Sequence, residues 1–221
     1  MKTAVIIGST GLVGRLLVKK LAREGSFGQI LAIVRRPPEG DEAFVNPRVR
    51  TLNFDFENWA DLELQLSSFA GSSALSFFCC LGTTIGKAGS QVAFRKVDLE
   101  HVVSFAKVAQ SCRAEQLLVV SAMGADAGSK VFYNQIKGEM EKAVENSFSG
   151  VLHFFRPSLL LGDRKDFRFG ERLAILTAPL YGPLLPRKYQ PVKAEHVAAC
   201  MLNVALRKIR VSKVIENPEM L

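Results

Sequence analysis

The sequence lacks the features that mark membrane-spanning, exported and disordered chains. No apolar stretch approaches the roughly 20 residues that span a bilayer. The apolar run that follows Lys2 is only four residues long and is broken by glycines, so we expect no export signal. Glycine (17) and proline (9) occur at ordinary frequency, which excludes collagen-like and disordered chains. With 221 residues, 48% of them hydrophobic, the chain can bury the core of a single domain.

Metal-binding patterns are also missing. The chain has four cysteines, at Cys79, Cys80, Cys112 and Cys200. None of them forms a Cys-x-x-Cys pair, and the adjacent Cys79 and Cys80 lie in an apolar run that is typical of buried free thiols. The three histidines have no mutual metal-ligand spacing, which favours satisfied or surface histidines over metal ligands. We therefore expect no metal, free thiols and a cytoplasmic location.

Long tracts of one charge are absent as well. The formal net charge is +8, but the basic residues occur as scattered pairs among acidic ones. A mildly basic surface of this kind usually has no specific partner, so we expect neither a specific nucleic acid nor a membrane. The expected partner is a small-molecule substrate whose identity the sequence does not reveal. Whether the chain forms a homodimer stays open.

Short apolar runs alternate with longer amphipathic ones, the pattern of parallel strands joined by helices. The expected strands span residues 3–7, 29–34, 48–53, 74–80, 116–120 and 151–155. The expected helices span residues 12–24, 60–67, 91–111, 129–146 and 193–207. This order predicts an α/β fold with a doubly wound parallel sheet of the Rossmann type. One domain of residues 1–221 is expected, within which residues 156–221 form a partly irregular substrate-side cap.

The turn after the first strand reads Gly8-Ser9-Thr10-Gly11-Leu12-Val13-Gly14, which is a Gly-x-x-Gly-x-x-Gly motif. Gly8 permits a tight turn, Gly11 lets the backbone approach a pyrophosphate, and Gly14 lets the helix pack closely on the strand. The N-terminus of that helix offers free N–H groups to the phosphates. A glycine-rich turn without a ligand is the alternative, but the flanking strand and helix favour a dinucleotide site.

The second strand ends in Ile33-Val34-Arg35-Arg36, with no acid before Glu39. A carboxylate at this place would repel a 2′-phosphate, whereas guanidinium groups bind one through charge-assisted hydrogen bonds. Two solvated arginines at a strand end are the alternative. We therefore expect Arg35 and Arg36 to favour NADP (NADPH) over NAD.

Tyr133 and Lys137 are one helical turn apart, which places a phenol and an ammonium on the same helix face. A tyrosine and a lysine at this spacing are common and carry little weight alone. Ser121, however, ends another apolar run before them. With the glycine motif, this order indicates a nicotinamide cofactor held beside a Ser–Tyr–Lys proton-transfer site. A capping hydroxyl is the alternative for Ser121.

Several segments carry a resemblance to a known family. They are the run Cys79-Cys80-Leu81-Gly82-Thr83-Thr84 and residues 53–57, 133–139 and 155–157. Together with the glycine motif they resemble the short-chain dehydrogenase/reductase superfamily, in particular its atypical members and the HTATIP2-like oxidoreductase family. The superfamily commonly has Asn-Ala-Gly after the fourth strand, where this chain has Leu81-Gly82-Thr83. We therefore expect the proton relay beyond Lys137 to differ.

The resemblance also implies roles for individual residues. Those implied to contact the cofactor are Asp55 and Phe56 at the adenine, Leu81, Gly82 and Thr83 along the pyrophosphate and ribose, and Pro157 and Ser158 near the nicotinamide. A turn-capping carboxylate is the alternative for Asp55, and local backbone hydrogen bonding is the alternative for Thr83.

The same resemblance implies that Ser121, Tyr133 and Lys137 are catalytic. Tyr133 would be the general acid when a carbonyl is reduced, and Lys137 would favour its ionised form and bind the nicotinamide ribose. Ser121 would donate to the substrate oxygen. The leading hypothesis is an NADP(H)-dependent oxidoreductase that acts on an unidentified carbonyl or alcohol. The alternative is an NADPH-responsive regulatory binding protein without turnover.

Overall fold

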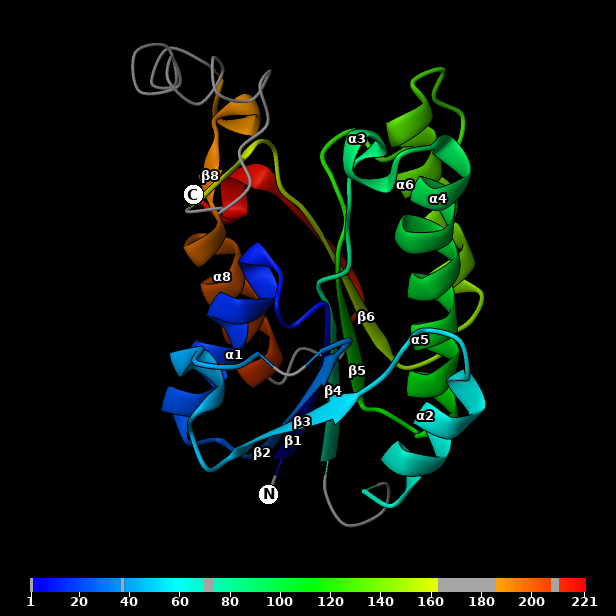
Figure 1. Cartoon of the computed structure of the whole chain (residues 1–221). Helices are drawn as coiled ribbons and strands as arrows, with labels where there is room; N and C mark the ends of the chain where they lie inside the picture. The colour runs from blue at the N-terminus through cyan, green and yellow to red at the C-terminus, as the bar shows by residue number, and fades with distance from the viewer. Residues whose placement is uncertain (1, 37, 70–73, 163–185, 208–210) are drawn as a thin grey trace.

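A computed structural model describes residues 2–36, 38–69, 74–162, 186–207 and 211–221 of the chain. These residues form three layers, with a central sheet between two layers of helices (Figure 1). Helices α1 and α8 cover one face of the sheet, and α2, α5 and α6 cover the other. The predicted doubly wound α/β fold is therefore confirmed. No helix among the described residues is long and apolar enough to cross a membrane.

The central sheet has seven parallel strands in the order β3-β2-β1-β4-β5-β6-β9. Their bounds are Lys2–Ile7 (β1), Phe27–Val34 (β2), Val49–Asn53 (β3), Ala74–Cys79 (β4), Gln116–Val120 (β5), Val151–Arg156 (β6) and Lys213–Glu216 (β9). A small second sheet pairs β7 (Leu160–Leu161) with β8 (Val192–Lys193). The strand order reverses between β1 and β4, and ligands of such sheets bind where this reversal occurs.

The helices follow the strands in the expected order. Their bounds are Leu12–Glu24 (α1), Trp59–Ser67 (α2), Ile85–Ala88 (α3), Gln91–Arg95 (α4), His101–Ser111 (α5), Phe132–Glu145 (α6) and Ala194–Leu206 (α8). Short 3-10 turns lie at Glu42–Phe44 (η1), Arg187–Tyr189 (η4) and Asn217–Glu219 (η5). A π-helical segment, η2 (Lys96–Glu100), joins α4 to α5 within what was expected to be one regular helix.

Two hydrophobic clusters fill the spaces on either side of the sheet. Along β1, Val5 and Ile7 pack toward α5, whereas Ala4 and Ile6 pack toward α1 and α8. This alternation follows from the two-residue period of a strand, and both faces are apolar because both are covered by helices. The four cysteines are free thiols. Burial raises the pKa of the Cys79 thiol to about 12, so it stays protonated as an apolar core group.

The C-terminal third differs most from expectation. Strand β9 joins the sheet beside β6 and was not predicted, because its four residues begin and end with charged side chains and lie at an edge. The predicted helix 193–207 corresponds to α8, which packs against α1. Residues 163–185, part of the predicted cap of residues 156–221, lie outside the described residues. The helix predicted to begin at residue 129 begins at Phe132.

Candidate active site

The turn after β1 has no room for side chains at two of its glycines. Gly8 has a φ of 72°, and a Cβ atom on it would lie 2.5 Å from the carbonyl carbon of Cys80. A Cβ atom on Gly14 would lie 2.2 Å from the carbonyl oxygen of Gly8. The backbone N–H of Gly11 donates to that same oxygen at 3.0 Å. The glycines therefore let β1, α1 and the chain after β4 approach closely, as the motif predicts.

The N-terminus of α1 has the features of a phosphate site. Gly11 is the N-cap and provides no side-chain cap, and the first turn contains no acidic residue. Thr10 and Gly11 are exposed, whereas Leu12 is half-buried and Val13 packs into the core. The first-turn N–H groups and the positive end of the helix dipole are thus not matched by a side-chain anion, which suits a pyrophosphate.

Arg35 and Arg36 lie beside this turn. The buried Ser9 hydroxyl donates to the carbonyl oxygen of Ile33 at 2.8 Å, which ties the glycine turn to the end of β2. The two arginines follow immediately after β2, and both are exposed. In a doubly wound sheet, groups at this position lie near the 2′ position of the adenine ribose.

Asp55 and Phe56 each make contacts with neighbouring groups of the protein. The Asp55 carboxylate accepts a hydrogen bond from the backbone N–H of Glu57 at 2.9 Å, which is the turn-capping alternative. Phe56 has a φ of 70°, a conformation that is uncommon outside glycine. Its ring packs against His101, with 5.0 Å between ring centroids, and against Trp59, with 6.0 Å. This aromatic packing holds the strained residue in place.

A buried ion pair anchors the lysine of the predicted catalytic group. The Lys137 ammonium lies 2.8 Å from Oδ1 of Asp98, and the two side chains are only 3% and 1% exposed. The other carboxylate oxygen of Asp98 accepts the backbone N–H of Thr83 at 2.8 Å. Asp98 therefore links α6 to the segment that follows β4. This segment contains Leu81-Gly82-Thr83, the residues at which the sequence departs from the Asn-Ala-Gly of the superfamily. The Thr83 N–H is therefore bonded to a side chain distant in the sequence, which differs from the local backbone hydrogen bonding given as the alternative for Thr83.

Sequence reasoning missed Asp98. It lies in the π-helical segment η2, and π-helical turns frequently occur at functional sites because they redirect side chains. The sequence feature that could have identified Asp98 is its spacing. Asp98 is four residues from both Phe94 and Val102, which are buried. An acid in an otherwise apolar helical stripe indicates a buried charge with a partner.

The electrostatic surroundings keep Lys137 charged. Burial lowers the pKa of this ammonium, but the charges of Asp98 and then of Tyr133 raise it by more, so the pKa lies above its ordinary value. Tyr133 is half-buried, and its ring packs against that of Phe94 with 5.6 Å between centroids. The phenol and the ammonium thus lie close enough to interact, as their spacing on α6 predicts.

Ser121 lies at the end of β5 with a buried hydroxyl that has no hydrogen-bonding partner among the described residues. Its backbone N–H donates to the carbonyl oxygen of Phe155 at 2.7 Å. A Cβ atom on Gly138 would lie 2.1 Å from the backbone nitrogen of Ala127, so α6 rests directly on the loop that follows Ser121. That contact positions the helix of Tyr133 and Lys137 relative to the unpaired Ser121 hydroxyl.

The remaining predicted residues lie along the same edge of the sheet. Leu81 is half-buried and Gly82 is exposed, directly after the Cys80 carbonyl that contacts Gly8. Pro157 is buried. The Ser158 hydroxyl donates to the backbone of Gln190 at 2.5 Å, so it is already engaged within the protein.

Comparison with known proteins agrees with this geometry. A family model described as NAD(P)H-binding matches residues 8–154. The protein HTATIP2 of Rattus norvegicus is 34% identical over 78% of this chain and 69% of its own length. The mitochondrial protein FMP52 of Eremothecium gossypii is 31% identical over 99% of this chain and 95% of its own length. The structure of Thermus thermophilus UDP-glucose 4-epimerase in complex with NAD covers 100% of this chain and 81% of that one, with 16% identity and a TM-score of 0.70.

The comparison corrects one expectation. The prediction of a cytoplasmic location is wrong, because several relatives of about 30% identity are named mitochondrial. Free cysteines indicate only that the surroundings are reducing, and they do not distinguish one reducing compartment from another.

Proposed function

Since this chain belongs to the NAD(P)H-binding family and is a homologue of HTATIP2, we propose that it is an NADP(H)-dependent oxidoreductase of the atypical short-chain type. Its substrate would be a carbonyl compound or the corresponding alcohol. The observation that carries this proposal is the buried Lys137–Asp98 pair one helical turn from Tyr133, at the same sheet edge as the glycine turn. Proton transfer requires a tyrosine beside a lysine, whereas binding of the cofactor alone does not require the tyrosine.

The proposed chemistry assigns a proton step to the chain itself. When bound, the nicotinamide supplies or accepts the hydride. Tyr133 donates its phenolic proton to the substrate oxygen during reduction and takes it back during oxidation. The positive charge of Lys137, one helical turn away, lies beside the phenol that would transfer the proton. The Ser121 hydroxyl, which has no partner among the described residues, donates a hydrogen bond to the same substrate oxygen as negative charge develops there.

The cofactor would lie across the carboxyl edge of the sheet. Its pyrophosphate would meet the glycine turn (Gly8 and residues 10–14), and a 2′-phosphate would meet Arg35 and Arg36. The other proposed contacts are Asp55 and Phe56 at the adenine, Leu81, Gly82 and Thr83 along the ribose, and Pro157 and Ser158 at the nicotinamide. For Asp55 and Ser158 these contacts would add to hydrogen bonds that each already makes.

NADPH should raise the melting temperature of the protein more than NADH does. A ligand that binds only the folded state stabilises it by about 2.7 kcal/mol at 100 times its Kd. Replacing both arginines (Arg35→Gln with Arg36→Gln) should weaken NADPH about tenfold or more, because charge-assisted hydrogen bonds are lost, and should leave NADH nearly unchanged. Differential scanning fluorimetry and calorimetric titration measure both effects.

The matched control removes two exposed charges elsewhere, Arg23→Gln with Lys107→Gln. This control should bind both cofactors like the wild type. Equal stabilisation by NADPH and NADH would show that the two arginines do not read a 2′-phosphate.

The proposed activity is tested by following NADPH oxidation with a panel of aldehydes, ketones and quinones. We expect at least one carbonyl class to be reduced with saturation kinetics. The alternative, an NADPH-responsive regulatory binding protein, predicts tight NADPH binding with no turnover of any compound in the panel. That result would replace the oxidoreductase with the regulatory protein.

A further inference from the structure

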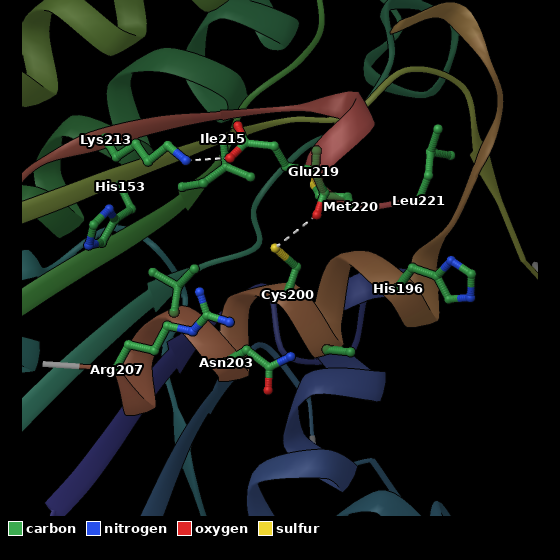
Figure 2. A pocket seen from close by; sticks show the side chains of 12 residues that line it. His153, His196, Cys200, Asn203, Arg207, Lys213, Ile215, Glu219, Met220 and Leu221 are labelled. Carbon is green, nitrogen blue, oxygen red and sulfur yellow. Dashed lines mark hydrogen bonds and ion pairs between the residues drawn. The ribbon is translucent and has the colours of Figure 1, made fainter. Parts of the chain in front are cut away.

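A buried amide side chain lies in the turn η5. Asn217 is 1% exposed, although the turn follows β9 at an edge of the sheet. Figure 2 shows how the turn is fastened: the Glu219 carboxylate pairs with Lys213 of β9, and the Cys200 thiol of α8 donates to the Glu219 carbonyl oxygen. The same carboxylate accepts the backbone N–H of Glu216 at 3.1 Å. These contacts fix the backbone that carries Asn217.

The Asn217 amide joins three segments that are far apart in the chain. Its Oδ1 atom accepts the backbone N–H of Ser158 at 2.9 Å. Its Nδ2 atom donates to the carbonyl oxygen of Gln190 at 2.8 Å and to that of Arg187 at 3.3 Å. Ser158 follows β6, whereas Arg187 belongs to η4 and Gln190 leads into β8. A buried amide that uses its acceptor and both of its donors on backbone groups holds those groups in a fixed arrangement.

The peptide group between Pro157 and Ser158 is held from both sides. Its carbonyl oxygen accepts the backbone N–H of Met123, in the loop that follows Ser121, at 2.9 Å. Its N–H is the group that donates to Oδ1 of Asn217. This one peptide is therefore fixed between the loop of the candidate catalytic serine and the turn η5. Loss of the Asn217 acceptor would leave its N–H without that partner, which favours other arrangements of the backbone.

The segment after Ser158 leads to the glycine turn. It forms β7, which pairs with β8 in the small second sheet. A Cβ atom on Gly162, just beyond β7, would lie 2.8 Å from the side chain of Leu12, so the segment rests on the start of α1. The backbone from Ser158 to Gly162 thus runs between the proposed nicotinamide contacts and the proposed pyrophosphate contacts. Asn217 anchors the first residue of this backbone segment.

We propose that Asn217 is a positioning residue for the nicotinamide half of the cofactor. It holds the Pro157–Ser158 peptide in place before the cofactor arrives, so that the nicotinamide meets a preformed surface. This inference rests on the proposed function, because it takes NADP(H) as the ligand and Pro157 and Ser158 as contacts of the nicotinamide. A preformed surface strengthens binding, because the apparent Kd rises as the fraction of molecules that are competent to bind falls.

Asn217→Ala should weaken NADPH selectively. If about a tenth of the variant molecules keep the Pro157–Ser158 peptide in place, the Kd of NADPH should rise about tenfold. Adenosine 2′,5′-bisphosphate carries the adenine and the 2′-phosphate but no nicotinamide, so its Kd should stay close to that of the wild type. Calorimetric titration of both compounds into the full chain measures the two constants.

Gln116→Ala is the matched control, because it also removes a buried amide. The Gln116 amide donates to the Ser76 hydroxyl at 2.9 Å and to the carbonyl oxygen of Ala205 at 3.0 Å. Gln116 begins β5, so it lies at the opposite edge of the sheet from the carboxyl ends of the strands. This variant should lose folding stability without a selective loss of NADPH affinity.

Hydrogen exchange adds a measurement that needs no variant. The Ser158 amide should exchange slowly in the cofactor-free wild type, since its N–H is already bonded to Asn217. A wild type that does not bind NADPH rejects the proposed function and this inference together. If the wild type binds NADPH, the inference alone is overturned by an unchanged NADPH affinity in Asn217→Ala, by an equal loss of both compounds in that variant, by the same NADPH loss in Gln116→Ala, or by fast exchange of the Ser158 amide.

Discussion

Replacing Tyr133 with phenylalanine should lower turnover by about 10²–10⁴-fold, the usual contribution of a positioned proton-transfer group. The substitution removes one hydroxyl and keeps the ring that packs against Phe94. NADPH affinity and the melting temperature should therefore change little. Steady-state NADPH oxidation and calorimetric titration measure the two quantities separately.

Tyr189→Phe is the matched control for this experiment. Tyr189 is 47% exposed in η4, where its ring lies under the Lys188 ammonium, and it contacts neither Lys137 nor Asp98. Its loss should leave turnover near the wild-type value. If Tyr133→Phe turns over like the wild type, Tyr133 is not the proton donor, and the proposed roles of Lys137 and Ser121 lose their basis.

Asp98→Asn should produce the largest loss of stability among the substitutions considered, about 3–5 kcal/mol in the free energy of unfolding. It leaves the Lys137 ammonium buried without its counterion, although an amide oxygen can still accept the Thr83 N–H. Denaturant unfolding measures the loss. Glu195→Gln, which breaks the exposed Lys20–Glu195 pair, should have a far smaller effect because solvent screens that pair.

A second variant separates a lost charge pair from a general packing defect. In the double variant Asp98→Asn with Lys137→Met, neither position of this pair carries a charge, so part of the lost stability should return. If the loss of stability in the double variant equals the sum of the losses in Asp98→Asn and Lys137→Met alone, Asp98 and Lys137 do not act as a pair.

The pH dependence of turnover tests the catalytic role of the same pair. Burial lowers the pKa of Lys137, and Asp98 is the principal group that raises it. Without Asp98 the lysine should lose its proton at a lower pH than in the wild type. The turnover defect of Asp98→Asn should therefore shrink as the pH is lowered and Lys137 regains its charge. A defect of constant size at every pH would indicate a purely structural role for Asp98.

The parts of this protein that could be predicted from the sequence are local in the chain. The glycine turn, the strand before it and the helix after it lie within a few consecutive residues, and their backbone requirements are those of glycine itself. The pairing of Tyr133 with Lys137 likewise follows from the helical repeat alone. The alternation of apolar runs was sufficient to predict a parallel sheet covered on both faces, which the structure confirms.

The tertiary structure decided what depends on residues far apart in the chain. Asp98 meets Lys137 and Thr83 only because α6, η2 and the end of β4 converge at the carboxyl edge of the sheet. The strand β9 gains its place from pairing with β6. A sequence records which side chains are available, whereas the burial that makes Asp98 a counterion arises from packing between distant segments.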